Sequence, residues 1–353
     1  MLKPKTVSIA GAGPAGLTAA ISLARAGYDV VVHEQHADVG MRFCGDFQAI
    51  ENWSFEEDVM TALSRIGITP DFYYRPIHQV SSFGPRSSTQ VSSAQPIAYL
   101  VERGSSKDSL DASLKRQAFE SGVQFRFGSC LTDTDADIIA TGPRRARTLA
   151  VGCIFETDVD ACTALLLDDN CAPKGYAYAL VAEGRGTLAT VLYEKFNQGK
   201  ICLESTMRRF KDLLGIQLRN VRYFGGYGDF DLARPTMVDD RRYVGEAAGF
   251  QDYLFGFGIR YAMLSGYLAA QSFVEGSNYD RLCRNCLRSR LRTSLVNRYC
   301  YQLLGQRGYN MLVRTSGRAR DPKQFWTKIY TQPFLRMLAY PFALRAANLT
   351  RNR

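Results

Sequence analysis

The sequence has no long hydrophobic run. No stretch approaches the roughly 18 uninterrupted apolar residues that a transmembrane helix needs. The N-terminal sequence MLKPKTVSIAGAG runs directly into an apolar strand pattern, without the charged start, apolar core and cleavage site of a signal peptide. We therefore expect neither a membrane-spanning helix nor a secretory leader. The hydrophobic content of 46% over 353 residues is enough for a large core and two domains.

Histidine and paired cysteine are also scarce. The three histidines, His33, His36 and His78, follow no metal-binding spacing. The nine cysteines are scattered and odd in number, which is typical of reduced thiols in a cytoplasm-like compartment. One Cys-x-x-Cys, formed by Cys283 and Cys286, has no second pair and indicates two cysteines on a helix face rather than zinc. The sequence thus predicts a cytoplasmic protein without a metal site.

Acidic residues are almost missing from the C-terminal region. Residues 281–353 hold sixteen Lys or Arg and one acid, Asp321, whereas the whole chain has a net charge of +10. Apolar residues interleave with the basic ones, as in FWTKIYTQPFLRMLAYPFALRAANLTRNR. This pattern favours peripheral contact with an anionic membrane surface. The alternative is a helical cap with a solvated basic face. No nucleic-acid-binding motif is present.

A nucleotide-binding motif stands at the start of the chain. In TVSIAGAGPAGLTAAISLARAGYDVVVHEQ, an apolar strand precedes a G-x-G-x-x-G turn, an amphipathic helix and a second strand. Gly11 permits the tight turn, Gly13 lets a pyrophosphate approach the backbone, and Gly16 lets helix and strand pack closely. The helix N-terminus attracts anions, and Glu34 is placed to accept hydrogen bonds from a ribose. The motif alone fits FAD and NAD equally.

Hydrophobic periodicity predicts the rest of the architecture. It indicates a helix over 48–67, a helix from Leu110 to a stop at Gly122, and an apolar strand in ADIIATGP. Such alternation predicts a parallel, doubly wound sheet. Residues 175–194 alternate around a glycine turn, as an antiparallel hairpin does.

The predicted fold is therefore α/β and discontinuous. We expect a Rossmann-like nucleotide-binding domain built from 1–70, 98–150 and 235–275. An antiparallel β-sheet domain for the substrate is expected over 71–97 and 151–234. Residues 276–353 would form the basic C-terminal helical region.

Several motifs together resemble a known group. GAGPAGLTAA…HEQ, ERGSSKDSLDASLKRQA, DIIATGP and VGEAAGFQDYLFGFGI resemble the two-domain FAD fold of the p-hydroxybenzoate-hydroxylase type. Within it, GYAYALV and FCGD resemble the aromatic substrate motif and the cysteine-glycine stretch of the geranylgeranyl reductase family. The resemblance implies an FAD-dependent oxidoreductase that reduces C=C bonds of an apolar isoprenoid by hydride transfer from the reduced flavin N5. NAD(P)H or another reductant would donate the electrons.

The resemblance also implies the site residues. The catalytic candidates are Cys44, Tyr176 and Tyr178, with Asp46 as a further candidate beside Cys44. The predicted FAD contacts are Gly11, Gly13, Pro14, Ala15, Gly16, Glu34, Gln35, Arg42, Cys44, Gly45, Arg103, Thr141, Gly142, Gly245, Glu246, Gly256, Gly258 and Ile259. Glu246 would accept a ribityl hydroxyl, and the backbone N–H groups around Gly256 to Ile259 would face the ring edge that becomes negative on reduction.

Several of these residues also have a simpler interpretation. Cys44 fits a small buried hydrophobe, Arg103 fits an ion pair, and the two tyrosines fit plain core. The chain also departs from the family, with Thr141 and Glu246 where Asp is usual.

Two other functions remain open. A flavin-dependent monooxygenase or halogenase shares the fold, although the W-x-W-x-I-P motif of halogenases is absent. The two altered acids leave room for a flavin-binding protein without catalysis. The oligomeric state is not indicated.

Overall fold

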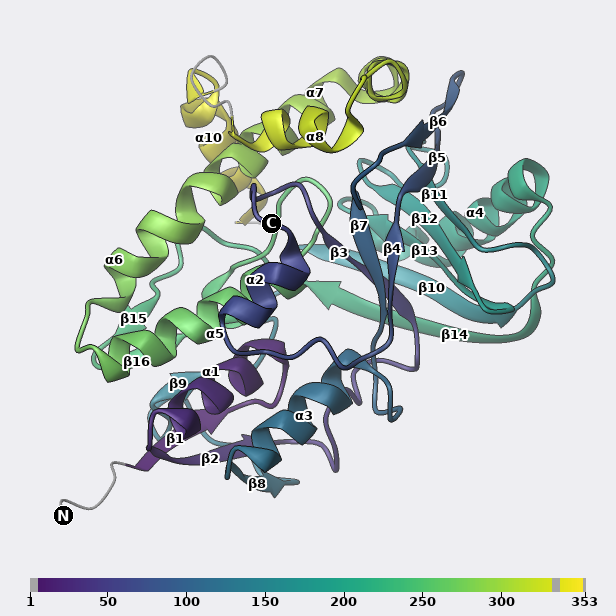
Figure 1. The fold of residues 1–353 in the computed structure, drawn as a ribbon. Coiled ribbons are helices and arrows are strands. Elements are labelled where there is room, and N and C mark those ends of the chain that lie inside the picture. Colours follow the sequence, from purple (N-terminus) through teal and green to yellow (C-terminus); the bar gives the residue numbers. More distant parts are fainter. Residues whose placement is uncertain (1–5, 332–336, 352–353) are drawn as a thin grey trace.

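The computed structural model describes residues 6–331 and 337–351. A six-stranded sheet has the order β15-β16-β9-β1-β2-β8 (Figure 1). Its strands are β1 Thr6–Ala10, β2 Asp29–Glu34, β8 Gln124–Phe127, β9 Ile138–Ile139, β15 Met237–Val238 and β16 Arg241–Tyr243. β1 pairs in parallel with β2 and β9, and β2 pairs in parallel with β8. The predicted parallel sheet is therefore confirmed, with β15 added antiparallel to β16 at its edge.

Three helices cover this sheet and are held close together by glycines. They are α1 Pro14–Arg25, α3 Leu110–Glu120 and α5 Ile259–Val274. A Cβ on Gly16 would lie 2.1 Å from the carbonyl oxygen of Gly11, so only glycine allows α1 to start this close to β1. In the same way, a Cβ on Gly266 would lie 2.1 Å from the carbonyl oxygen of Ala15. The N-terminal turn of α1 is thus fixed from both sides.

A small antiparallel sheet, with the order β3-β7-β4, lies beside the parallel one. It consists of β3 Phe47–Glu51, β4 Tyr74–Ile77 and β7 Ala98–Glu102. The helix expected over 48–67 is wrong in its first part, because Phe47–Glu51 pairs along β7 and only α2, Val59–Arg65, is helical. The Asp58 carboxylate caps α2 by accepting hydrogen bonds from the N–H groups of Met60 and Thr61. Cross-strand pairing and burial of Phe47 outweigh the helical periodicity.

A seven-stranded sheet forms the other half of the molecule, with the order β14-β10-β13-β12-β11-β5-β6. Its strands are β5 Gln79–Phe83, β6 Ser88–Ser92, β10 Thr148–Glu156, β11 Cys162–Leu166, β12 Tyr176–Ala182, β13 Arg185–Leu192 and β14 Arg219–Gly228. β12 and β13 form the predicted hairpin. Helix α4, Gly199–Leu214, packs against β10 and β13. β10 begins at Thr148, before the expected boundary at residue 150, and β4, from the expected substrate-domain segment 71–97, pairs with β7 in the smaller sheet.

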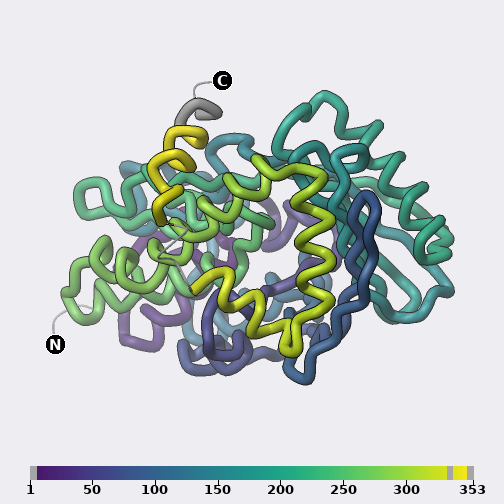
Figure 2. Tube along the Cα trace, turned by 90° about the horizontal axis from the view of Figure 1, so that it is seen from above, coloured from purple at the N-terminus to yellow at the C-terminus, as the bar shows by residue number. Residues whose placement is uncertain are grey.

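The C-terminal region is helical, as expected. It contains α6 Tyr279–Cys283, a short π-helix Arg284–Arg288, α7 Ser289–Gly317, α8 Pro322–Thr331 and α10 Tyr340–Arg351. Helix α7 is broken at Gly305, whose φ of 52° and ψ of −143° suit glycine. Figure 2 shows these helices lying across the face that is viewed from above. Within the described ranges, no helix is both long and apolar enough to cross a membrane.

The crossing of α1 and α5 gives a stability prediction. We expect Gly266→Ala to lower the free energy of unfolding by about 1–3 kcal/mol, because the new methyl group overlaps the Ala15 carbonyl and forces the helices apart. Urea unfolding followed by circular dichroism measures the change. The matched control is Gly226→Ala, since a Cβ there meets no atom within 4 Å. Equal stability of the two variants would contradict the role of Gly266.

Candidate functional site

A cavity of about 840 Å³ lies between the parallel sheet and the seven-stranded sheet. Of the residues predicted from the sequence, it is lined by Gly11, Gly13, Pro14, Ala15, Glu34, Gln35, Arg42, Arg103, Thr141, Gly142, Tyr176, Tyr178, Gly245, Glu246, Gly256, Gly258 and Ile259. Gly16, Cys44 and Gly45 are not part of this lining. Segments separated by more than 200 residues in the chain thus meet at one cavity, whose volume is within the usual range for cofactor sites, about 300–1,000 Å³.

The first end of the cavity is the N-terminus of α1. Gly13 is the N-cap, and no side chain accepts a hydrogen bond from the first turn, which also has no acidic residue. A Cβ on Gly13 would meet no atom within 4 Å, so the space in front of this turn is open. Its free N–H groups therefore point a partial positive charge at the cavity, where an anion would be stabilised.

Glu34 closes the same end from β2. Its Oε2 accepts a hydrogen bond from the Ala12 N–H at 2.9 Å, and its Oε1 accepts from the His36 N–H at 3.1 Å. These bonds hold the carboxylate against the glycine turn at the strand end. A ribose diol in the cavity would meet an acceptor that is already oriented.

The N-terminus of α5 also borders the cavity. Gly258 is its N-cap, again without a side-chain cap and without an acid in the first turn. The preceding loop is held by Gln251, whose Nε2 donates to the Gly256 carbonyl at 2.7 Å. The buried Oε1 of Gln251 has no hydrogen-bond partner among the described residues. Gln251 was not predicted as a site residue, because only the folded loop turns its amide toward the cavity.

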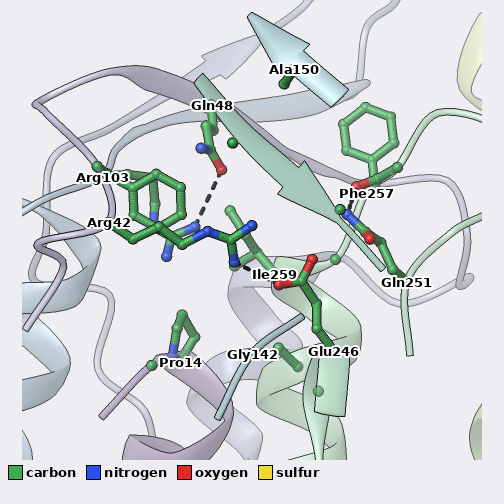
Figure 3. Close-up of a pocket in the computed structure, with 18 of the residues that line it drawn as sticks. Pro14, Arg42, Gln48, Arg103, Gly142, Ala150, Glu246, Gln251, Phe257 and Ile259 are labelled. Atoms are coloured by element: carbon green, nitrogen blue, oxygen red, sulfur yellow. Dashed lines mark hydrogen bonds and ion pairs between the residues drawn. The ribbon is translucent and has the colours of Figure 1, made fainter. Parts of the chain in front are cut away.

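An ion pair joins two parts of the cavity lining that lie far apart in the sequence. The Arg42 Nη1 lies 2.6 Å from the Glu246 Oε2, and the Arg42 guanidinium also donates to the Tyr227 carbonyl (Figure 3). Glu246 lies in the short helix Gly245–Ala248. Its Oε1 makes no hydrogen bond to a described residue, so the Glu246 carboxylate is paired with Arg42 and still has an oxygen free to accept. This pairing, over 204 positions, has no signal in the sequence.

Arg103 belongs to a buried ion pair rather than a surface one. Its Nε and Nη2 donate to the two carboxylate oxygens of Asp111 at 2.8 and 2.9 Å, and its Nη1 donates to the Gln48 Oε1 at 3.2 Å. Burial lowers the pKa of Arg103, but the Asp111 carboxylate more than offsets this, so the pKa lies above its ordinary value. The guanidinium carbon lies 4.0 Å from the centre of the Phe43 ring. Arg103 is therefore a fixed positive charge on the cavity wall.

The residues around Cys44 are arranged differently from the expectation. The Asp46 side chain is buried and lines the cavity, while Cys44 lies outside the lining. The Asp46 Oδ1 accepts from the Cys44 N–H at 3.2 Å, and its Oδ2 accepts from the Gln48 Nε2 at 2.9 Å. Burial and the Asp46 carboxylate raise the pKa of Cys44, so it is held as a thiol. Asp46 and Gln48 thus supply the polar groups on this wall.

The rest of the cavity is apolar and aromatic. Tyr176 and Tyr178 lie on one face of β12 with ring centres 6.3 Å apart. The Tyr176 hydroxyl donates to the Phe255 carbonyl, and this hydrogen bond links β12 to the loop before α5. Burial raises the pKa of Tyr178, so its hydroxyl stays protonated. The surrounding lining includes Trp53, Ile77, Val80, Val91, Ile97, Leu165, Leu180, Phe224, Phe257 and Trp326.

Metal-type ligands do not gather near this cavity. Within residues 6–331 and 337–351, no group of three His, Cys, Asp or Glu side chains could hold an ion. Cys283 is buried in α6, and Cys286 is half-buried in the π-helix that follows.

Comparisons with known proteins bear on the fold. A family profile described as an NAD(P)-binding Rossmann-like domain matches residues 9–46. Among curated proteins, no sequence matches the chain. A geranylgeranyl bacteriochlorophyll reductase-like protein from Thermoplasma acidophilum is similar in structure, with a TM-score of 0.73 and 19% identity over 98% of this chain and 99% of that one.

Two further solved structures share the fold. A flavin-dependent brominase variant has a TM-score of 0.64 and 15% identity, over 98% of this chain and 99% of that one. A 2-methyl-3-hydroxypyridine-5-carboxylic acid oxygenase has a TM-score of 0.56 and 16% identity, over 90% and 94% of the two chains. At these identities the likeness establishes the fold, and the expected Rossmann-like fold with an inserted antiparallel sheet is confirmed.

The buried ion pair on the cavity wall gives a second prediction. We expect Asp111→Asn to lower the free energy of unfolding by about 3–5 kcal/mol, because it leaves the buried Arg103 guanidinium without a counter-charge. Guanidinium chloride unfolding measures the loss. In the control Asp158→Asn, the partner Arg219 is exposed, and we expect little change. If Asp111→Asn unfolded at the same guanidinium chloride concentration as the wild type, Arg103 would need no buried counter-charge.

Proposed function

We propose that this protein is an FAD-dependent oxidoreductase. The observation that carries the proposal is that two uncapped helix N-termini, those of α1 and α5, border the same cavity. FAD carries negative charge at two separated places, its pyrophosphate and, when reduced, the N1–C2=O edge of its ring. An N-terminus of the kind found in α1 and α5 stabilises each of them. The flavin-dependent brominase variant that shares the fold supports the same cofactor.

The donor set along the cavity fits FAD in order. Glu34 would bind the adenosine ribose, and the α1 turn would bind the pyrophosphate. The Oε2 of Glu246 is paired with Arg42, and the Oε1 would accept a ribityl hydroxyl. The side chain of Glu246, which is one methylene longer than the Asp usual in the family, would thus make both contacts. Of the other predicted contacts, Gln35, Thr141 and Gly142 line the cavity beside this path. The orphaned Oε1 of Gln251 would accept an N–H of the ring. NAD alone would leave the α5 terminus and Gln251 unused.

The substrate we propose is an isoprenoid chain with C=C bonds. Bound FAD would supply hydride from its reduced N5. The aromatic and aliphatic lining from Trp53 to Trp326 excludes water and offers apolar contact along a chain. Asp46, Gln48 and Arg103 form a polar wall that would hold a polar end of the substrate. The chain's own contribution is therefore to orient the substrate and keep the site dry. We propose NAD(P)H as the reductant.

A monooxygenase or halogenase is the second candidate, because a brominase and an oxygenase share the fold. The apolar lining beyond the proposed FAD contacts favours an aliphatic substrate over a small polar aromatic one. A flavin-binding role without catalysis is less favoured, since the altered Glu246 keeps an accepting oxygen.

Flavin binding is tested with Glu34→Gln. We expect the variant to bind FAD on the order of tenfold more weakly, because an amide accepts ribose hydrogen bonds less strongly than a carboxylate does. Quenching of FAD fluorescence during titration gives the affinity. The control is Glu204→Gln, an exposed acid on α4, which we expect to match wild type. A wild-type protein that takes up no FAD would refute the cofactor.

Alkene reduction is tested separately. The flavin-loaded protein is reduced anaerobically and mixed with geranylgeranyl diphosphate or a geranylgeranyl lipid. We expect product masses raised by pairs of hydrogens, and slower turnover in Trp326→Ala, which removes part of the apolar lining. Trp326→Phe should keep most of the activity. Oxygen insertion into an added aromatic, with no hydrogen gain in the isoprenoid, would favour the monooxygenase instead.

A further inference from the structure

The basic C-terminal region does not hang free from the protein. The Tyr301 hydroxyl of α7 donates to the Gly175 carbonyl at 2.6 Å, and the Asn310 Oδ1 accepts from the Arg86 N–H at 2.9 Å. Trp326 of α8 is 9% exposed and lines the cavity. The inner sides of α7 and α8 are therefore part of the fold, and only their outer sides are open to a partner.

The second half of α7 has two clearly different sides. Gly308, Tyr309, Val313 and Ser316 are buried against the protein. On the other side, the residues Arg307, Met311, Arg314 and Arg318 are exposed, and their spacing of four, three and four puts them on one helix face. Met311 is 55% exposed in the middle of this face. An exposed apolar side chain thus lies between arginines on this face of α7.

Two exposed leucines lie next to this face, directly before the break in α7 at Gly305. Leu303 and Leu304 directly precede the break and are 72% and 50% exposed. Figure 2 shows α7 bending sharply on the face that is viewed from above. Exposing two neighbouring leucines to water is unfavourable, and a group of exposed apolar side chains often marks a contact site. We call Leu303, Leu304, Arg307, Met311, Arg314 and Arg318 the α7 face.

The charge of the α7 face is uncompensated. Arg307, Arg314 and Arg318 form no ion pair with any residue in the described part of the chain, whereas Arg284 and Arg288 of the same C-terminal region pair with Asp280. The acid nearest in sequence is Asp321, which accepts hydrogen bonds at the start of α8. A surface with three free guanidinium groups and three exposed apolar side chains is complementary to an anionic, partly apolar partner.

We propose that the α7 face docks on an anionic lipid bilayer. Arginines attract the acidic headgroups, and the leucines with Met311 enter the boundary between headgroups and acyl chains, the arrangement of an interfacial amphipathic helix. The proposal narrows the membrane contact expected of residues 281–353 to one face of one helix and stands independently of the alkene chemistry.

Docking would also place the cavity beside the membrane. Helix α8 follows α7 directly and contributes Trp326 to the apolar end of the cavity. Figure 1 shows α7 and α8 together above the smaller antiparallel sheet. The α7 face would therefore lie on the same side of the molecule as the helix that lines the apolar part of the cavity.

The test is sedimentation of the full-length protein with vesicles of phosphatidylcholine, with or without phosphatidylserine. We expect binding that requires phosphatidylserine and weakens with salt. The double variant R307E/R314E should lose roughly tenfold or more in vesicle affinity, and L303S/L304S should weaken binding at both low and high salt. The control K200E/R208E reverses two exposed charges on α4 and should bind as wild type does.

Three results would overturn the proposal. They are the absence of wild-type binding to anionic vesicles, equal binding by R307E/R314E, and equal loss in the α4 control. A fluorescent oligonucleotide is titrated in parallel. Binding to it that depends on Arg307 and Arg314, without vesicle binding, would assign the face to nucleic acid instead. We expect each variant to fold, because the substituted side chains are exposed. Circular dichroism of each variant checks this.

Discussion

The close crossing of α1 and α5 is the constraint on which the site depends. Gly266 lets α5 approach the Ala15 carbonyl, and the same packing directs both helix N-termini at one cavity. Neither terminus is capped by a side chain or carries an acid in its first turn. Among the described residues, two partial positive charges are thus left without a side-chain partner, and a ligand with two anionic regions would complement them.

The remaining charges hold the walls in place around these termini. The Arg42–Glu246 pair ties the segment after β2 to the short helix before α5, and the buried Arg103–Asp111 pair anchors α3 to β7. Both pairs leave polar atoms at the cavity surface. Beyond them the lining becomes aromatic, so the cavity changes from a polar part, which contains the α1 N-terminus, to an apolar part that includes Trp326 of α8. A flavin reacting with an apolar substrate needs both parts.

Much of this could be predicted from the sequence, because the glycine turn, Glu34 and the stretch around Glu246 have local signatures. The strand Phe47–Glu51 was missed since its pairing with β7 is a long-range contact that helical periodicity does not show. Asp111, Gln251 and Trp326 were missed for the same reason. Cys44 had a family signature, yet the backbone turns Asp46 rather than Cys44 toward the cavity. The C-terminal charge was visible, but not which side of α7 is buried.

The central claim is that both helix N-termini hold one flavin. A crystal structure of the protein grown with FAD tests it most directly. The account predicts pyrophosphate density at the N-terminus of α1 and the N1–C2=O edge of the ring at the N-terminus of α5, with Gln251 beside the ring. A dinucleotide at α1 that leaves the α5 terminus empty, or one that runs outside the cavity, would contradict it.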